Sequence, residues 1–114
     1  MGEMEELISE YKKTSALLAQ NNPEAAEAFS ALSKAVTKDG ALSRKVKELI
    51  ALGIAIAVRC EYCIAIHAQL AINAGATREE MLEAAEVAVL MGGGPARTYV
   101  TELRKALEEF QKQG

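Results

Sequence analysis

The sequence predicts an all-α fold, and three observations point to it. Apolar residues recur at spacings of three and four, which is the period of an amphipathic helix. Alanine is abundant and only 4% of the residues are aromatic, which favours closely packed helices over a core of strands. Capping residues and glycines divide the chain into about six helices. With 114 residues, we expect a single domain over residues 1–114.

The first two helices are expected to meet at Asn21-Asn22-Pro23. Asn22 can cap the second helix, and Pro23 suits its first position. Glu24 and Glu27 then place negative charge in its opening turns, where the helix dipole favours it. Both helices carry an apolar stripe, the first with Leu7, Tyr11, Leu17 and Leu18 and the second with Phe29, Leu32 and Val36.

Two further helices are expected in the middle of the chain. Asp39-Gly40 ends the second helix, and Ser43 is the expected N-cap of a mostly buried third helix from Arg44 to about Val58. After a break near Arg59, a fourth helix is expected to run from about Cys60 to Asn73, with Gly75 as its stop.

The last two helices are expected on either side of a glycine triplet. Thr77-Arg78-Glu79-Glu80 has the pattern of a capping box for the fifth helix. Gly92-Gly93-Gly94 breaks that helix, and Pro95 begins the sixth. A phosphate-binding loop at the triplet is disfavoured because no strand precedes it and no Lys-Ser/Thr pair follows.

The net charge and the hydropathy of the sequence argue against two classes of protein, nucleic-acid-binding proteins and membrane-spanning proteins. The formal net charge of −3 argues against a nucleic-acid-binding protein, which would carry a basic face. The longest apolar stretch, Leu49 to Val58, is too short for the ~20 residues of a membrane span. The acidic start has no secretory pattern, so we expect a soluble cytoplasmic protein. The high apolar content of so small a chain suggests a homo-oligomer.

Three residues, Cys60, Cys63 and His67, are candidates for catalytic residues. Each residue of an α-helix turns the chain by about 100° around the helix axis. If the three residues belong to one helix, Cys63 is therefore rotated by about 60° and His67 by about 20° from Cys60, and all three side chains lie along one narrow stripe of the helix surface. A thiol one turn from an imidazole is a nucleophile beside a base. Two cysteines at the start of a helix can also close into a disulfide, which permits a two-electron cycle without metal or organic cofactor.

Glu48 is the fourth candidate. It lies in an otherwise apolar run, where a buried carboxylate is costly without a partner. If the helices on either side of Arg59 fold back antiparallel, Glu48 can lie over His67 or the thiols and orient the imidazole.

Each of these features also has a structural interpretation. The cysteines can be two small buried residues, and the histidine a structural side chain. Glu48 can lie on the surface, since Lys45 and Lys47 show that part of its helix faces water. The four residues could instead bind zinc, although three ligands on one helical stripe cannot readily surround an ion. The position of the chain's one histidine a turn after its one cysteine pair favours redox chemistry.

The spacing from Glu48 through Cys60 and Cys63 to His67 resembles the signature of the carboxymuconolactone decarboxylase superfamily. It is similar in particular to the alkyl hydroperoxidase D-like (AhpD-like) branch, whose signature has Glu, eleven residues, Cys, two residues, Cys, three residues and His. The resemblance extends over roughly residues 42–103. It implies an all-α AhpD-like fold that forms trimers or hexamers, with active sites near the subunit interfaces.

The resemblance also implies roles for the four residues. Cys63 would be the peroxidatic thiol, Cys60 the resolving thiol, and Glu48 with His67 the proton relay. The sequence departs from the AhpD enzymes at Tyr62, where they carry a histidine directly before the second cysteine. The decarboxylase branch is similar in fold but does not depend on a cysteine pair.

Two enzymatic functions follow as hypotheses. The first is a thiol peroxidase or disulfide oxidoreductase that reduces hydroperoxides and is restored by an external dithiol, with no metal and no cofactor. The second is a lyase acting on a small carboxylated lactone through His67 and Glu48, with Arg59 and Arg97 as candidates to bind the carboxylate.

Overall fold

The fold is built from five α-helices. The structure, a computed structural model, describes residues 2–111, and this part of the chain contains helices and no strand. As expected from the sequence, the fold class is all-α. The helices are α1 (Glu3–Asn21), α2 (Pro23–Thr37), α3 (Arg44–Ala57), α4 (Glu61–Asn73) and α5 (Arg78–Phe110). Within residues 2–111, none of them combines the length and apolar character needed to cross a membrane.

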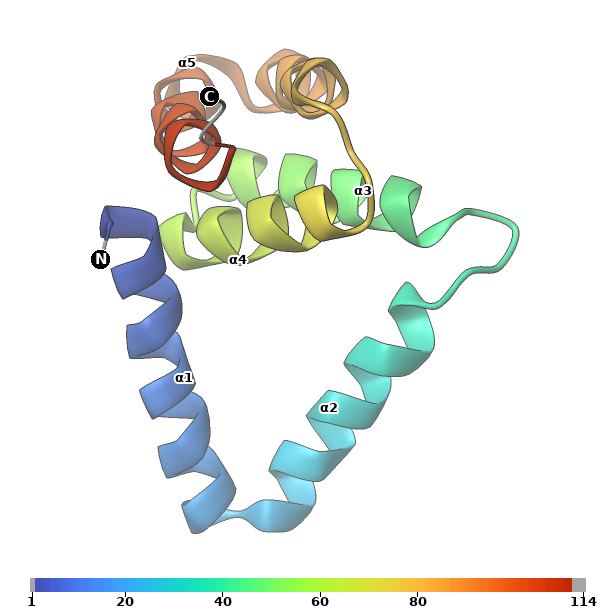
Figure 1. Ribbon diagram of the computed structural model, residues 1–114, viewed down its shortest axis with the longest axis vertical. Helices are drawn as coiled ribbons and strands as arrows, with labels where there is room; N and C mark the ends of the chain where they lie inside the picture. The colour runs from blue at the N-terminus through green and yellow to red at the C-terminus, as the bar shows by residue number, and fades with distance from the viewer. Residues whose placement is uncertain (1, 112–114) are drawn as a thin grey trace.

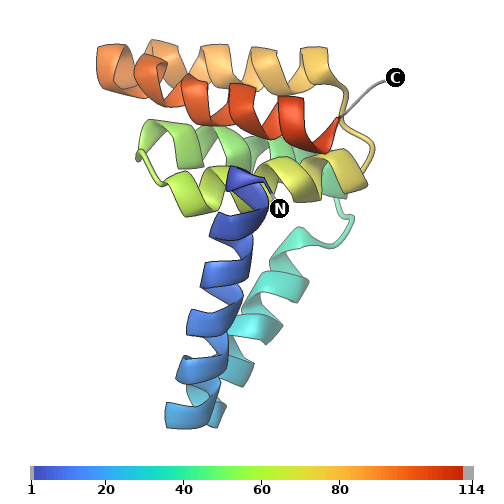
Figure 2. The ribbon, with the colours of Figure 1, turned by 60° about the vertical axis from the view of Figure 1, so that its left-hand side comes forward.

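The fifth and sixth helices expected from the sequence are both present, but they are joined across a kink and counted as the single element α5, so the structure has five elements where about six helices were expected. Only Gly93 leaves helical geometry there, with φ 73° and ψ −158°, a conformation that glycine adopts without a steric penalty. The chain reverses at this residue, and the two parts of α5 run side by side in Figure 2. The break therefore lies where it was predicted, but one residue is enough to make it.

The helix starts follow the predicted caps. The side chains of Asn22, Ser43 and Thr77 accept hydrogen bonds from backbone N–H groups in the first turns of α2, α3 and α5. The capping box at α5 is complete: the Thr77 Oγ1 accepts from the Glu80 N–H at 3.1 Å, and the Glu80 carboxylate accepts from the Thr77 N–H at 2.9 Å. Local sequence patterns thus fix where these helices begin.

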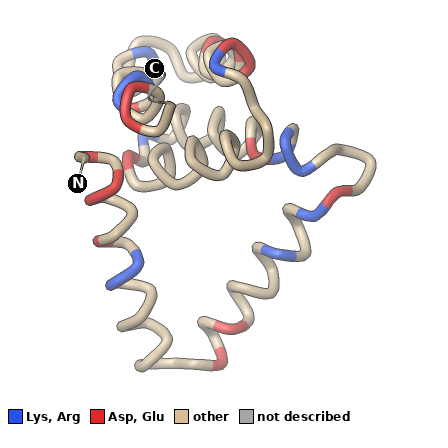
Figure 3. Tube along the Cα trace, in the orientation of Figure 1, with Lys and Arg blue, Asp and Glu red and all other residues tan. Residues whose placement is uncertain are grey.

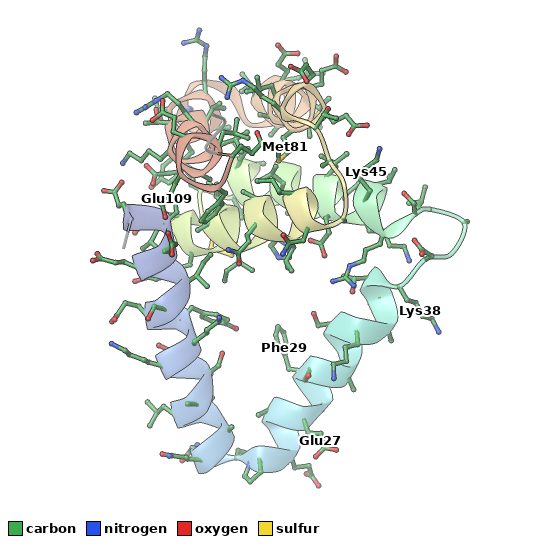
Figure 4. The ribbon with its side chains drawn as sticks, viewed as in Figure 1. Glu27, Phe29, Lys38, Lys45, Met81 and Glu109 are labelled. Atoms are coloured by element: carbon green, nitrogen blue, oxygen red, sulfur yellow. A yellow bond between two sulfur atoms is a disulfide. The ribbon has the colours of Figure 1, made fainter. Side chains whose placement is uncertain are left out.

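An antiparallel pair of helices, α3 and α4, forms the middle layer of the molecule. Both parts of α5 cover one face of this layer, while α1 and α2 project from the other side (Figure 1). The core lies between α5 and the middle layer, where Met81 points inward from α5 (Figure 4). Its largest fully buried apolar side chains are Met4, Leu52, Ile56, Ile64, Met81, Leu103 and Leu107.

The expectation of a mostly buried third helix is wrong. One face of α3 is buried through Leu52, Ala55 and Ile56, but the opposite face is open. The exposed apolar residues of α3 are Val46, Ile50 and Ile54. The apolar content of this helix predicts burial on both faces, whereas α4 and α5 cover only one.

Helices α1 and α2 form a projecting arm, by which we mean residues 3–37. They diverge from the middle layer and approach each other only at their shared turn (Figure 1). The start of α1 is fixed by Glu109 of α5, whose carboxylate accepts from the N–H groups of Met4 at 3.1 Å and Glu5 at 2.8 Å. The end of α2 is fixed by Lys47, whose Nζ donates to the carbonyl oxygens of Val36 at 2.8 Å and Lys38 at 2.7 Å.

An ion pair between α3 and α5 predicts how stability responds to acid. The ammonium of Lys45 lies 2.9 Å from the Glu80 carboxylate and, together with the Thr77 N–H, lowers the pKa of Glu80. A carboxyl whose pKa is lower in the folded state stabilises the fold above its unfolded pKa, and this contribution is lost as the pH falls through the folded value. We therefore expect Glu80→Gln to lower the melting temperature at neutral pH and to approach wild type in acid. Circular dichroism melts at several pH values test this, and a pH-independent difference would contradict it.

Candidate functional site

The turn between α3 and α4 sets the geometry of the site. Arg59 adopts a left-handed conformation with φ 59°, a region usually occupied by glycine at the end of a helix. The Cys60 N–H donates to the Ala55 carbonyl at 3.0 Å, and the Arg59 N–H donates to the Ile56 carbonyl at 3.1 Å. These are the two hydrogen bonds of a Schellman motif, which ends α3 and turns the chain back at once.

Cys60 is the N-cap of α4. Its Sγ accepts a hydrogen bond from the Cys63 N–H at 3.2 Å, in the manner of a capping side chain. The sequence predicted Cys60 in or just before the first turn, and the structure has it just before. Cys60 and Cys63 are joined in a disulfide, with Cα atoms 5.2 Å apart. Unpaired N–H groups at a helix start favour a thiolate there, so reduction releases the thiols into a favourable electrostatic environment.

His67 and Glu48 form the second half of the site. The Nδ1 of His67 lies 2.7 Å from the Oε1 of Glu48. Only 1% of the Glu48 side chain is exposed, so the interpretation of Glu48 as a surface residue is wrong. An ionised carboxylate can only accept a hydrogen bond, so beside an ionised Glu48 a neutral imidazole would carry its hydrogen on Nδ1 and leave Nε2 as the acceptor. The buried carboxylate thus orients the ring.

The disulfide and the histidine lie on the same side of α4. Cys63 and His67 are four residues apart and therefore lie one turn apart on the same side of α4. Both are partly buried, as is Cys60, whereas Ile64 and Ala68 on the inner side are fully buried. The sulfur atoms and the imidazole therefore lie at the margin of the core, where a reactant from solvent can approach them.

The structure separates the two arginines named for the lactone hypothesis. Arg59 is exposed and directly precedes Cys60. Arg97 lines a hollow of about 540 Å³ between the two parts of α5, together with Leu82, Val89 and Arg104. None of the four candidate site residues lines this hollow. Across residues 2–111, no group of three or more His, Cys, Asp or Glu side chains is placed to hold a metal ion.

The sequence did not predict the backbone conformation of one residue, Arg59, which turns the chain from α3 into α4. Arg59 was expected near a helix break, but its left-handed backbone was not, because no glycine or asparagine marks the position. Tyr62, the departure from the AhpD signature, is exposed in the first turn of α4.

Comparisons with known proteins identify relatives over most of the chain. A sequence model described as the carboxymuconolactone decarboxylase family matches residues 23–106. An uncharacterized protein of Cupriavidus necator is 38% identical over 103 residues, which are 90% of this chain and 88% of that protein. An uncharacterized protein of the cox locus of Paracoccus denitrificans is 39% identical, over 86% of this chain and 91% of its own length.

Two solved structures are also similar. A carboxymuconolactone decarboxylase family protein of Legionella pneumophila, in its apo form, superposes with a TM-score of 0.90 at 43% identity, covering 94% of this chain and 96% of its own. A family protein of Thermotoga maritima, for which involvement in an antioxidative response has been suggested, has a TM-score of 0.82 at 28% identity, over 92% of this chain and 90% of its own.

The contact between Glu48 and His67 predicts a stability effect. Replacing His67 by Phe leaves a buried carboxylate without its partner, and we expect the free energy of unfolding to fall by about 2 kcal/mol or more. The double variant Glu48→Leu/His67→Phe removes the orphaned charge and is expected to recover much of the loss. Urea denaturation of the two variants and wild type measures this. A double variant no more stable than His67→Phe alone would contradict the pairing.

Proposed function

The chain belongs to the carboxymuconolactone decarboxylase family, and we propose that it acts there as an AhpD-like thiol peroxidase. In this proposal the enzyme reduces hydroperoxides through the pair Cys60 and Cys63, and an external dithiol restores the pair. One observation carries the proposal: a disulfide at the start of α4 lies one helical turn from an imidazole that a buried carboxylate orients. The antioxidative role suggested for the Thermotoga maritima relative agrees with it.

The proposed oxidative step begins with both cysteines reduced. The thiolate of Cys63 attacks one oxygen of the hydroperoxide, the O–O bond breaks, and the other oxygen leaves as an alcohol after taking a proton. Cys63 is then a sulfenic acid, which the Cys60 thiol attacks. The new S–S bond expels water, so two thiols are oxidised as one hydroperoxide is reduced to an alcohol and water.

His67 and Glu48 would manage the protons of this cycle. His67 lies one turn after Cys63, and its Nε2 is the ring nitrogen not engaged by Glu48. Nε2 can accept the Cys63 proton before attack and return one to the leaving oxygen. Glu48 stabilises the imidazolium formed in between, because its carboxylate stays 2.7 Å from Nδ1. The assignment of Cys63 as nucleophile rests on this proximity and on the family signature.

The reductive step requires a second substrate. A dithiol protein or a lipoyl group would attack the disulfide, leave as a disulfide itself, and return two electrons and two protons to the cysteines. The half-buried disulfide at the edge of α4 is accessible to such a group. We also propose a reducing, cytoplasmic location and a homo-oligomeric assembly, a trimer or hexamer.

The competing proposal is a lactone decarboxylase that uses His67 and Glu48 and not the thiols. Arg59, next to Cys60 in sequence and exposed, is the remaining candidate to bind a substrate carboxylate near the site. This proposal requires activity that survives alkylation of the cysteines, which separates it from the peroxidase.

Replacing Cys63 by Ser is expected to abolish peroxide turnover, because the hydroxyl of serine cannot be oxidised to a sulfenic acid or form a disulfide with Cys60. Consumption of tert-butyl hydroperoxide with dihydrolipoamide as reductant is the measurement. Cys60→Ser should still consume one equivalent and leave a sulfenic acid on Cys63, which dimedone trapping and mass spectrometry detect. Ala41→Ser, in the exposed loop before α3, serves as a control expected to match wild type. Turnover by Cys63→Ser would exclude Cys63 as the nucleophile.

Replacing His67 by Gln is expected to slow alkylation of reduced Cys63 by iodoacetamide at pH 7 by about tenfold, because the thiolate loses its adjacent base. Gln69→Asn is the matched control, since Gln69 is on α4 but lines a hollow against α1. Equal rates for His67→Gln and wild type would remove His67 from the proton relay.

A further inference from the structure

Arg59 is the one residue other than glycine that has a left-handed backbone among residues 2–111. In this conformation the Cβ of an L-residue comes too close to the following carbonyl oxygen, so the position after a helix that ends in a Schellman motif is usually a glycine. Glycine would therefore fit this turn better than arginine does. Strained residues are concentrated at functional sites, and a strained arginine directly before Cys60 points to a function for its side chain.

Neither the turn nor the packing accounts for an arginine at position 59. The turn is held by backbone hydrogen bonds from the N–H groups of Arg59 and Cys60, which any residue except proline can donate. The Arg59 side chain is exposed, so it fills no part of the core. Its guanidinium takes part in none of the ion pairs formed within residues 2–111.

Two residues of opposite charge flank Cys60 in the sequence. Arg59 directly precedes Cys60, and Glu61, the first residue of α4, directly follows it; both side chains are exposed. Glu61 is the one Asp, Glu, Lys or Arg of α4, and most of this helix is tan in Figure 3. A carboxylate beside a cysteine disfavours the thiolate, whereas a guanidinium favours it. With glycine at position 59, the charge next to Cys60 would be that of Glu61 alone.

The other elements that meet this turn place little charge close to Cys60. Helix α5 packs on the end of α3 at its glycine kink, where an added Cβ on Gly92 would lie 3.6 Å from the Cα of Ala57, and residues 92–95 carry no charge. Helix α1 meets α4 near Gln69, more than two helical turns after Cys60. The other charged groups of these elements nearest the turn are Arg97 of α5, Glu5 and Lys12 of α1, and Glu48, which is paired with His67.

We propose that Arg59 tunes the reactivity of the disulfide: its charge offsets that of Glu61, so that Cys60 can leave as a thiolate when a reductant opens the bond. The N–H groups at the start of α4 act in the same direction. A better stabilised thiolate leaves faster in thiol–disulfide exchange. This inference rests on the proposed thiol chemistry and deepens it, because it assigns the sulfur that leaves.

The reductive step then has a defined direction. A thiolate of an external dithiol attacks the Sγ of Cys63, the bond between Cys63 and Cys60 breaks, and Cys60 departs with the electron pair. The second thiol of the reductant closes a disulfide within the reductant and releases Cys63. The reductant thus loses the two electrons that the cysteines gain, and its two protons pass to the cysteine sulfurs through solvent.

The test separates the charge of residue 59 from its backbone. Arg59→Gly removes the charge and suits the left-handed turn, whereas Arg59→Lys keeps the charge. In the single-thiol background Cys63→Ser, absorbance at 240 nm across a pH titration reports the thiolate of Cys60. Arg59→Gly is expected to shift the ionisation of Cys60 about threefold toward the neutral thiol, the effect of a unit charge ~7 Å away in water. Arg59→Lys is expected to match the parent, and Glu61→Gln to shift the ionisation the other way.

The matched control is Arg78→Gln, which removes a positive charge from the exposed start of α5 and is expected to leave the ionisation of Cys60 unchanged. An ionisation of Cys60 that is the same with arginine and glycine at position 59 would overturn the proposal. An Arg59→Lys variant that behaves like Arg59→Gly would overturn it as well, because the effect would then come from the backbone.

The rate of reduction provides a second measurement, with Cys63 present. Excess dithiothreitol, which carries no carboxylate that Arg59 could bind, is expected to open the disulfide of Arg59→Gly about twofold more slowly than that of wild type. The difference is expected to shrink in 1 M NaCl, where the screening length is about 3 Å. Equal rates at low salt would contradict the assignment of Cys60 as the leaving sulfur. Neither measurement uses a hydroperoxide, so this proposal can fail while the peroxidase proposal stands.

Discussion

A carboxylate placed in an apolar helix requires a partner, and this requirement connects the two helices of the middle layer. Glu48 is almost fully buried in α3, and the partner that the structure provides is the imidazole of His67 in α4. For the two to meet, the chain must reverse within a few residues between α3 and α4. The left-handed backbone of Arg59 makes this reversal and leaves Cys60 to begin α4. The same turn therefore brings His67 to the buried carboxylate of Glu48 and places Cys60 at the start of α4.

Short-range patterns in the sequence were enough to locate most helix starts and the candidate residues. Ser43 and Thr77 cap the helices they were expected to cap, because a capping side chain bonds only to the next few N–H groups. The proximity of Cys63 and His67 likewise follows from a spacing of four within one helix. The contact between Glu48 and His67 was one of three alternatives, since Glu48 could also have lain over the thiols or on the surface, and the choice depended on how closely α3 and α4 fold back.

Other features depend on long-range packing and could not be predicted in the same way. The stripe of Phe29, Leu32 and Val36 predicts an apolar face, but it does not say whether the same chain covers that face. The exposed side of α3 is a similar case, because an apolar run looks the same whether a neighbour covers one face or both. Gly93 shows a third limit: three consecutive glycines permit a break, and packing of α5 on the middle layer decides which residue makes it.

The short sequence separation of the two cysteines determines how much the disulfide affects the stability of the fold. Only two residues lie between Cys60 and Cys63, and both ends of the bridge already belong to one helix start. A crosslink between near neighbours restricts the unfolded chain much less than one that joins distant segments. Opening or closing this disulfide is therefore expected to shift the global folding equilibrium only a little, so that a change in its redox state does not require the molecule to unfold.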